Sequence, residues 1–423
     1  MTLISKIETP ACGCESGTGL VSIDQALSLI TSAAGVIHDV ERLPLAAAKG
    51  RVLAEPVVAL APSPPFDNAA MDGYAVDTRT LVGPGPWRLE VRDRILAGMK
   101  GDRTLKAGEA ARIFTGAPVP PGADAVVMQE DIDRTGSGIL LCRRPRPGMH
   151  VRRTGEDLAR GAKVLPVGRR LDAPALAAAA AAGLATVAVR RRVRVALLTG
   201  GDEVRQPGQE LAPGEIWDVN SFMLSAAVET PAAQLVEVAH VGDDPADLEH
   251  LLGRVSRSAD LVITVGGISV GSADRVKPTI AKLAGPPVFS GVAIKPGKPV
   301  SFGRIGSAFW LGLPGNPVSA FITWELFGRW LVAHLAGEAQ PGRPRSHVVT
   351  ASPLRHRPGR CELRPARIVG QDGTGRDIAD CSQETRSAVV SALAEAHGAV
   401  LIHSDVESVA EGSLLEFVPF ISE

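Results

Sequence analysis

The sequence has no long apolar run, few aromatic residues and no excess of charge of either sign. Its longest candidate for a membrane span, ALAAAAAAGLA, is too short and too weakly apolar to cross a bilayer. The amino terminus lacks the basic start and apolar stretch of a signal peptide. Aromatic residues make up 4% of the chain and the net charge is −1, so neither a basic face nor aromatic platforms indicate nucleic-acid binding. We therefore expect a protein that binds neither membranes nor nucleic acids.

Cysteine and histidine are too scattered to predict a metal centre. The chain has five cysteines, and Cys12 and Cys14 are not followed by a second pair at ligand spacing. An odd number of dispersed thiols is typical of the reducing cytoplasm, where we expect this protein to act. The usual nucleotide and hydrolase motifs are also missing: GxGxxG after a strand, GxxxxGK[ST] and GxSxG. Classical NAD enzymes, P-loop kinases and α/β-hydrolases are therefore disfavoured.

The length of 423 residues predicts several domains, and changes of pattern place their limits. Alternating strands and helices with nearly continuous apolar strands predict a central doubly wound parallel α/β sheet domain in a multidomain α/β protein. The predicted limits are 1–20 for a flexible leader, 21–60 with 154–190 for an N-terminal mixed domain, 61–153 for an inserted β domain, 191–340 for the α/β domain and 341–423 for a small C-terminal β domain.

Glycine, carboxylates and lysines recur where the predicted strands of the α/β domain end. The strand ends carry Glu203, Asp243, the run GGISVGSAD and, after a fourth predicted strand PVFSGVAIK, Lys295 with Lys298. Ligands of open parallel sheets bind beyond these ends. Glycines let backbone N–H groups approach an anion, lysines neutralise it, and carboxylates beside it require a hard cation such as Mg²⁺. The pattern therefore predicts a site for an anionic, phosphorylated ligand with a divalent cation.

The stretch PSPPFDNAAMDGYAV lies outside this predicted sheet and has a different character. Phe66, Met71 and Tyr74 are interleaved there with Asp67 and Asp72. Apolar side chains at such spacing predict a loop that packs and holds its carboxylates still.

Eight blocks along the chain resemble, in order, the MoeA-type molybdopterin molybdenumtransferase family, which is similar to the E domain of gephyrin. The blocks are PPFDNAAMDGYAV, RIFTGAPVPPGADAVVMQED, RRTGEDLARG, GDEVRQPGQELAPGEIWDVN, VGDDP, VITVGGISVGSAD, AIKPGKPVSFG and GLPGNPVSAF. The resemblance implies a molybdopterin-binding fold for the α/β domain and insertion of molybdate into adenylylated molybdopterin with release of AMP. It also implies Mg²⁺ dependence and a homodimer whose active sites lie between subunits.

The same resemblance assigns residues. It implies catalytic roles for Asp72, Thr115, Asp157, Glu203, Asp243, Asp274 and Lys295, with Mg²⁺ held by Asp243 and Asp274. It implies substrate binding, or shaping of the binding loops, by Arg152, Asp218, Asn220, Gly266, Gly267, Ser269, Gly271, Lys298, Pro314 and Pro317. Because Asp72 lies outside the sheet domain, we expect another subunit or domain to bring it to the site. Asp67 is expected to hold its own loop.

Three alternatives stay open. The adenylylation of molybdopterin is a neighbouring reaction, although the N-terminal loop and the C-terminal β domain argue against it. A non-catalytic molybdopterin-binding or scaffold paralogue is the second, and a paralogue that handles tungstate is the third. We also expect transient contacts with the molybdopterin adenylyltransferase and with apo-molybdoenzymes.

Overall fold

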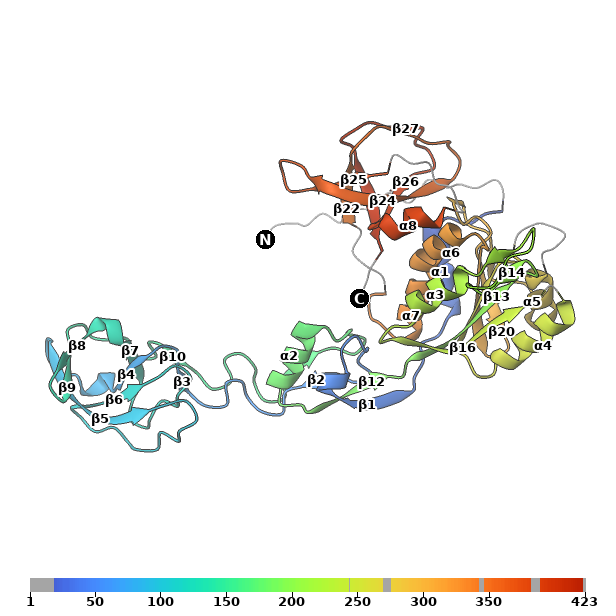
Figure 1. The fold of residues 1–423 in the computed structure, drawn as a ribbon. Helices are drawn as coiled ribbons and strands as arrows, with labels where there is room; N and C mark the ends of the chain where they lie inside the picture. Colours follow the sequence, from blue (N-terminus) through green and yellow to red (C-terminus); the bar gives the residue numbers. More distant parts are fainter. Residues whose placement is uncertain (1–18, 243, 269–274, 342–345, 382–388, 421–423) are drawn as a thin grey trace.

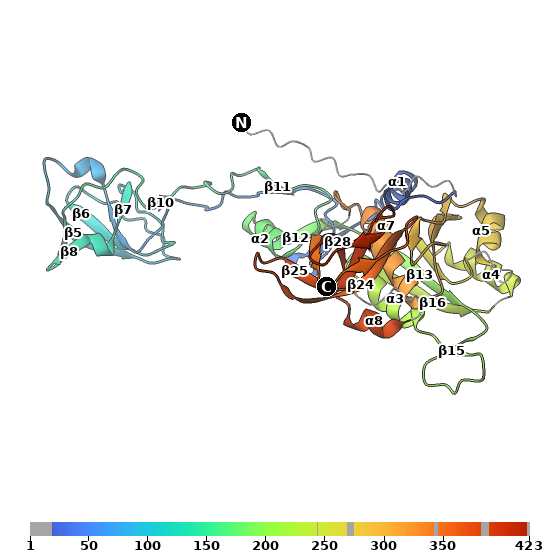
Figure 2. The ribbon, with the colours of Figure 1, turned by 90° about the horizontal axis from the view of Figure 1, so that it is seen from above.

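The computed structural model describes residues 19–242, 244–268, 275–341, 346–381 and 389–420. The molecule is elongated, with a small β module at one end and a mixed α/β unit at the other (Figure 1). Figure 2 shows the same separation from above, with extended chain between the two ends. This is a multidomain α/β fold, whereas the predicted residue limits of the domains stay predictions. No helix among the described residues is long and apolar enough to span a membrane.

The sheet of the α/β unit has the strand order β16-β13-β17-β21-β20-β18. Four neighbouring strands are parallel: β16 (Ala233–Val241), β13 (Val193–Gly200), β17 (Leu261–Val265) and β21 (Ala308–Leu313). β20 (Ser301–Ile305) and β18 (Phe289–Ser290) add an antiparallel edge. The prediction of a purely parallel sheet was thus correct for its centre and wrong for this edge.

Both faces of this sheet are buried under helices. Successive side chains of a strand point to opposite faces, so each strand contributes to two cores. Along β13, Val195 and Leu197 join one apolar core, whereas Ala196 and Leu198 join the other. The first core includes α1 (Ile23–Ala33), α3 (Asn220–Val228) and the continuous helix α6 (Pro317–Thr323), η4 (Trp324–Gly328, π-helical) and α7 (Arg329–Leu335). The second core includes α4 (Pro245–Val255) and α5 (Val276–Ala284).

Helix α1 begins with a capping box, in which Ser22 Oγ accepts from the N–H of Gln25 and Gln25 Oε1 accepts from the N–H of Ser22. Its apolar face packs on α7, and Trp330 Nε1 donates to Thr31 Oγ1 at 3.1 Å. We predicted a helix here, as part of the N-terminal mixed domain. In the structure its apolar residues contribute to the core of the α/β unit.

The predicted fourth strand, residues 287–295, is not one strand. It divides into β18 at the sheet edge and β19 (Ile294–Lys295), which pairs in parallel with β24 (Cys361–Gln371) of the C-terminal region. The strand that follows β17 in the sheet is β21. The short apolar run was read as one strand because periodicity cannot show where a chain leaves one sheet for another. Lys295 is therefore carried by the C-terminal sheet.

That C-terminal sheet joins β19 and β24 to β25 (Asp377–Asp380), β22 (Ser346–Thr350), β28 (Leu414–Pro419) and β26 (Gly398–Ile402). β26 also pairs with β24, so that five of the strands form a closed ring. A closed ring leaves no free edge among these strands, and β19 is added beside it.

The β module at the far end has the strand order β7-β4-β6-β5-β9-β8. Its strands are β4 (Gly73–Val76), β5 (Trp87–Ile95), β6 (Glu109–Ile113), β7 (Ala125–Met128), β8 (Ile132–Thr135) and β9 (Gly138–Leu141). Each face carries its own small apolar core. We call this sheet, with the pair β3 (Asn68–Ala69) and β10 (Val151–Arg152), the distal module.

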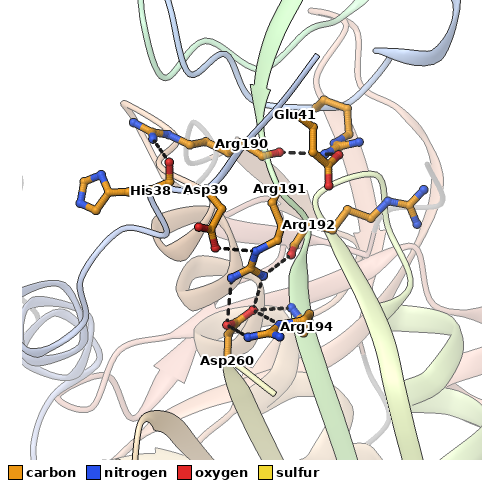
Figure 3. Close-up of polar contacts among 9 residues, drawn as sticks. His38, Asp39, Glu41, Arg190, Arg191, Arg192, Arg194 and Asp260 are labelled. Carbon is orange, nitrogen blue, oxygen red and sulfur yellow. Dashed lines mark hydrogen bonds and ion pairs between the residues drawn. The ribbon is translucent and has the colours of Figure 1, made fainter. Parts of the chain in front are cut away.

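Between the two ends lie α2 (Ala173–Ala181), the pair β2 (Val57–Val58) and β11 (Lys163–Leu165), and the antiparallel ribbon of β1 (Val40–Pro44) and β12 (Thr186–Arg190). Ion pairs join this ribbon to the α/β unit (Figure 3). Arg191 donates to Asp39 at 2.8 Å and to Asp260 at 2.7 Å, and Arg194 donates to Asp260 at 2.9 Å. The Asp260 carboxylate therefore anchors the ribbon just before β17.

Candidate functional site

A cavity of about 1030 Å³ opens at the carboxyl ends of β13, β17 and β21, where a parallel sheet binds ligands. Nine of the residues singled out in the sequence line it: Glu203, Asp218, Asn220, Gly266, Gly267, Lys295, Lys298, Pro314 and Pro317. Asp243, Ser269, Gly271 and Asp274 lie outside the described residues. Asp72, Thr115, Arg152 and Asp157 do not line the cavity, and Figures 1 and 2 show their part of the chain at the far end of the molecule. The predicted site is thus divided between two regions.

The glycines after β17 have backbone angles that side chains rarely adopt. The φ angles of Gly266 and Gly267 are 88° and 61°, and a Cβ on Gly267 would lie 2.8 Å from Val276 Cγ2. The turn can therefore approach both α5 and a ligand closely only because side chains are missing. The anion-binding role of this turn stays a prediction.

Asp218 and Asn220 form a fixed turn before α3. The nearly buried Asp218 carboxylate accepts from the N–H of Ser221 at 2.9 Å and from Thr199 Oγ1 at 3.3 Å. Asn220 Nδ2 donates to the Gly315 carbonyl at 2.7 Å, which fixes the orientation of its amide. Its Oδ1 is buried and has no hydrogen-bond partner in the described part of the chain. Asp218 thus supports the turn, while Asn220 presents an unused acceptor.

Lysine and arginine side chains give the cavity a cationic side. They are Arg275, Lys295, Lys298 and Arg360. Lys295 is half-exposed, and its Nζ lies 3.5 Å from the buried carboxylate of Glu362 on β24. Arg364 Nε also donates to this carboxylate, at 3.0 Å. The C-terminal sheet therefore positions a cation in the cavity of the α/β unit.

Carboxylates lie at the neighbouring strand ends. Glu203 lines the cavity after β13, and Asp202 lies beside the end of β16: a Cβ on Gly242 would be 2.8 Å from Asp202 Oδ1. The end of β13 thus places a carboxylate against the end of β16.

Asp72 is held at the surface of the distal module. Its Oδ1 accepts from both the N–H and the Oγ1 of Thr115, each at 2.8 Å. These two hydrogen bonds, the backbone one first, lower the pKa of Asp72 below its ordinary value, with a smaller contribution from Arg112. The Arg112 guanidinium lies 4.9 Å from the centroids of both Tyr74 and Phe114, behind this turn. An ionised carboxylate is therefore presented in a fixed position.

The packing of the loop PSPPFDNAAMDGYAV, residues 62–76, differs in part from the prediction. Tyr74 is buried, but Phe66 and Met71 are 44% and 43% exposed, so they do not pack the loop as we expected. Alternation with polar residues alone does not tell which side of a loop faces the core. Asp67 has a structural role, but it ties this loop to another segment and does not cap the loop from within: its carboxylate accepts from Arg153 at 2.6 Å and from the N–H of Thr154 at 2.8 Å.

Arg152 and Asp157 lie at the base of the distal module. Arg152 pairs with Asn68 in the β3–β10 ladder, and the N–H of Asp157 donates to the Ser63 carbonyl at 3.0 Å. Both side chains are exposed.

Sequence reasoning missed several residues at or beside the cavity, among them Trp217 and Arg360, which line it, and Glu362, which contacts Lys295. Trp217 directly precedes the turn of Asp218, and an aromatic residue beside a binding turn was a signal that was available. Arg360 and Glu362 had no such signal, because their position depends on β19 crossing into the C-terminal sheet.

Comparisons with known proteins agree with this geometry. Residues 21–183 match the family model "MoeA N-terminal region (domain I and II)", and residues 196–334 match "Probable molybdopterin binding domain". The chain is 40% identical over 384 residues to molybdopterin molybdenumtransferase 2 of Mycobacterium tuberculosis (strain ATCC 25618 / H37Rv), covering 88% of this chain and 93% of that protein. It is 37% identical over 326 residues to the molybdopterin molybdenumtransferase of Haemophilus influenzae, covering 77% and 80%.

A solved structure shows a similar arrangement over nearly the whole chain. It is the molybdopterin biosynthesis moeA protein from Pyrococcus horikoshii OT3, with a TM-score of 0.82 and 29% identity over 95% of this chain and 100% of that one. The motifs, the divided site, the matched family models and the identity to relatives over most of their length all agree. The chain belongs to the MoeA-type molybdopterin molybdenumtransferase family.

Proposed function

We propose that this chain inserts molybdenum into molybdopterin, using adenylylated molybdopterin and molybdate as substrates and releasing AMP. Relatives at 37% and 40% identity that are named for the molybdenum transfer support its place in molybdenum cofactor biosynthesis as a transferase. The finer proposal, which concerns the adenylylated substrate, rests on the chemistry of the cavity. We further propose that the protein acts in the cytoplasm and that it contacts the molybdopterin adenylyltransferase and apo-molybdoenzymes.

The single observation that carries this proposal is the combination of groups around one cavity. A glycine turn, two lysines and two arginines face carboxylates at the ends of parallel strands. Molybdate and pyrophosphate are oxyanions, and they need cationic groups and N–H donors. In this proposal Lys295 and Lys298 neutralise phosphate or molybdate oxygens, Glu203 orients the bound substrate, and Pro314 and Pro317 shape the loop beside them.

Magnesium is proposed as the divalent cation of the site, held by Asp243 and Asp274, which both lie outside the described residues. Among the described residues, no three histidine, cysteine, aspartate or glutamate side chains gather as a metal site. The carboxylate of Asp202 lies beside Gly242, and oxygen donors of this kind fit Mg²⁺. When bound, the ion would neutralise pyrophosphate oxygens.

The distal module is proposed to complete the site of a second copy of the chain. Asp72 and Thr115 are fixed to each other but lie far along the molecule from the cavity of their own chain (Figures 1 and 2). A homodimer in which each module reaches its partner's cavity would bring them together, and Arg152 and Asp157 would follow at the base of the same module.

The test is incubation of the protein with adenylylated molybdopterin, Mg²⁺ and molybdate. Release of AMP only when molybdate is present is the expected result, and Asp274→Asn should abolish it. Consumption of ATP with molybdopterin would instead identify an adenylyltransferase, and binding without turnover would identify a scaffold. Tungstate in place of molybdate tests which oxyanion is preferred.

A further inference from the structure

A half-exposed tryptophan stands at the rim of the cavity. Trp217 lines the cavity with 52% of its surface exposed, and its neighbours Leu211 and Ile216 line it while 37% and 54% exposed. Large apolar side chains gathered at the mouth of a polar site are typical of a surface that a ligand covers. Trp217 is therefore a candidate contact for a flat, apolar part of the ligand.

The ring of Trp217 is held in one orientation. β14 (Val204–Arg205) pairs with β15 (Ile216–Trp217), and the connecting loop projects from the α/β unit in Figure 2. An ion pair of 2.7 Å between Arg205 and Glu215 supports the base of this loop. Trp217 Nε1 donates to the Gln209 carbonyl at 3.2 Å. Because the ring is already oriented, the side chain of Trp217 loses little entropy when a ligand stacks on it.

A buried acceptor lies three residues further along the same turn. Asn220 lines the cavity, its Nδ2 is committed to the Gly315 carbonyl, and its Oδ1 is buried with no partner in the described structure. Buried polar atoms are nearly always paired, so an unpaired acceptor in a ligand cavity indicates a donor on the ligand. An N–H of an amino group would satisfy Oδ1.

We propose that Trp217 stacks on the planar nitrogen heterocycle of the ligand while Asn220 Oδ1 accepts from an amino group of that heterocycle. The ligand's phosphate then meets the cationic side of the cavity at Lys295 and Lys298. Adenine and pterin both provide a flat ring with an amino group. The proposal rests on the proposed function for the choice of these two rings, but its test requires binding alone.

Calorimetry on the full chain tests the stack with AMP, with ribose 5-phosphate and with 6-hydroxymethylpterin. Stacking of a base on an aromatic side chain predicts that Trp217→Ala weakens the binding of the stacked ring about 10- to 100-fold. Trp217→Phe keeps a ring and should change the affinity by about threefold or less. Ribose 5-phosphate lacks a heterocycle, so its affinity should be the same in all variants.

Phe222→Ala is the matched control, because Phe222 is 59% exposed on the neighbouring helix α3 but does not line the cavity. If Trp217→Ala weakens the binding of AMP alone, the ring that stacks on Trp217 is adenine. If it weakens the binding of the pterin alone, the stacked ring is the pterin. If Trp217→Ala binds both rings as tightly as Phe222→Ala does, the stack is wrong.

The hydrogen bond to Asn220 has its own test. For an adenine ring, the monophosphate of purine riboside lacks only the amino group and should bind about tenfold more weakly than AMP. Equal affinity of the two nucleotides, in a protein where Trp217→Ala weakens AMP, would overturn the role of Asn220. These measurements also separate the two proposals: binding through Trp217 without molybdate-dependent release of AMP would contradict the proposed function and leave the stack intact.

Discussion

The cavity of the α/β unit and the surface of the distal module hold their charged groups in different ways. In the cavity, side chains from several elements converge, and Lys295 is held there by a carboxylate of the C-terminal sheet. On the distal module, the partly exposed Asp72 is held by neighbours of its own module, chiefly Thr115. The cavity is suited to enclose a ligand, whereas the distal module presents one group at a surface.

This difference bears on how each region would act. A carboxylate fixed by a backbone N–H and a hydroxyl, on a rigid sheet, is suited to contact something that the rest of the chain binds elsewhere. Phe66 and Met71 are exposed on the same loop, and exposed apolar residues are typical of a contact surface. These features support the proposal that the distal module contributes to the site of a second copy.

The largest effect is expected when one residue of each region is substituted in a separate chain and the two variants are then mixed. We expect Asp72→Asn and Lys295→Ala each to lower the rate of AMP release by about 100-fold or more, since each removes a charge at the reacting groups. Refolding the two inactive variants together at equal amounts should restore about a quarter of wild-type activity, because half of the dimers are mixed and each mixed dimer has one intact site.

Complementation requires that Asp72 and Lys295 act from different subunits. If both act within one subunit, no mixture can contain an intact site, and activity stays at the level of the single variants. A control mixture of Asp72→Asn with Thr115→Ala places both changes on the same module and should recover nothing.

The two regions also differ in how much of them the sequence could predict. The strand ends of the α/β unit were predictable because β13 and β17 are nearly continuous apolar runs followed by glycine or charge. A structural role of Asp67 was predicted, but its partners were not predictable, because Arg153 and Thr154 lie 86 and 87 residues further along the chain. The approach of Glu362 to Lys295 was not predictable either, because it depends on β19 leaving one sheet for another, which a local pattern does not encode. The packing of α1 on α7, 299 residues apart at the Thr31–Trp330 hydrogen bond, was missed for the same reason.

A smaller effect is expected at the junction of the two regions, where Asp260 joins the ribbon to the α/β unit (Figure 3). Asp260→Asn should lower the unfolding free energy of the α/β unit by about 2 kcal/mol, since charged hydrogen bonds to Arg191 and Arg194 are weakened in a partly buried site. The distal module should keep its own unfolding transition. Calorimetric unfolding with two resolved transitions measures both quantities.

The pH dependence of the same junction follows from the pKa of Asp260. Burial alone would raise this pKa, but hydrogen bonds from Arg191 and Arg194 outweigh it, so the net shift is downward. A carboxyl whose pKa is lowered by folding contributes its stabilisation fully above its unfolded pKa, and loses it as the pH falls through the folded value. The difference between wild type and Asp260→Asn should therefore be constant near neutral pH and shrink below about pH 4. Glu249→Gln, at the more exposed ion pair with Lys282, is the control and should change stability little at any pH.

The smallest expected effect distinguishes Asp67 from Asp72 in the loop of residues 62–76. The N–H of Thr154 lowers the pKa of Asp67, with Arg153 adding to it against a partial cost of burial. Asp67→Asn should destabilise the distal module by about 1 kcal/mol, a modest value because the Arg153 partner is 55% exposed. Asp72→Asn should destabilise the module less than Asp67→Asn while removing activity, since the amide keeps an oxygen acceptor for Thr115 and no ion pair with an arginine is lost. The lowered pKa of Asp67 means that its stabilisation is complete at neutral pH and is lost in acid, so the effect of Asp67→Asn should fade towards pH 3. If Asp72→Asn destabilised the module as much as Asp67→Asn, Asp72 would be a structural anchor, and its loss of activity would no longer argue for a contact with a second subunit.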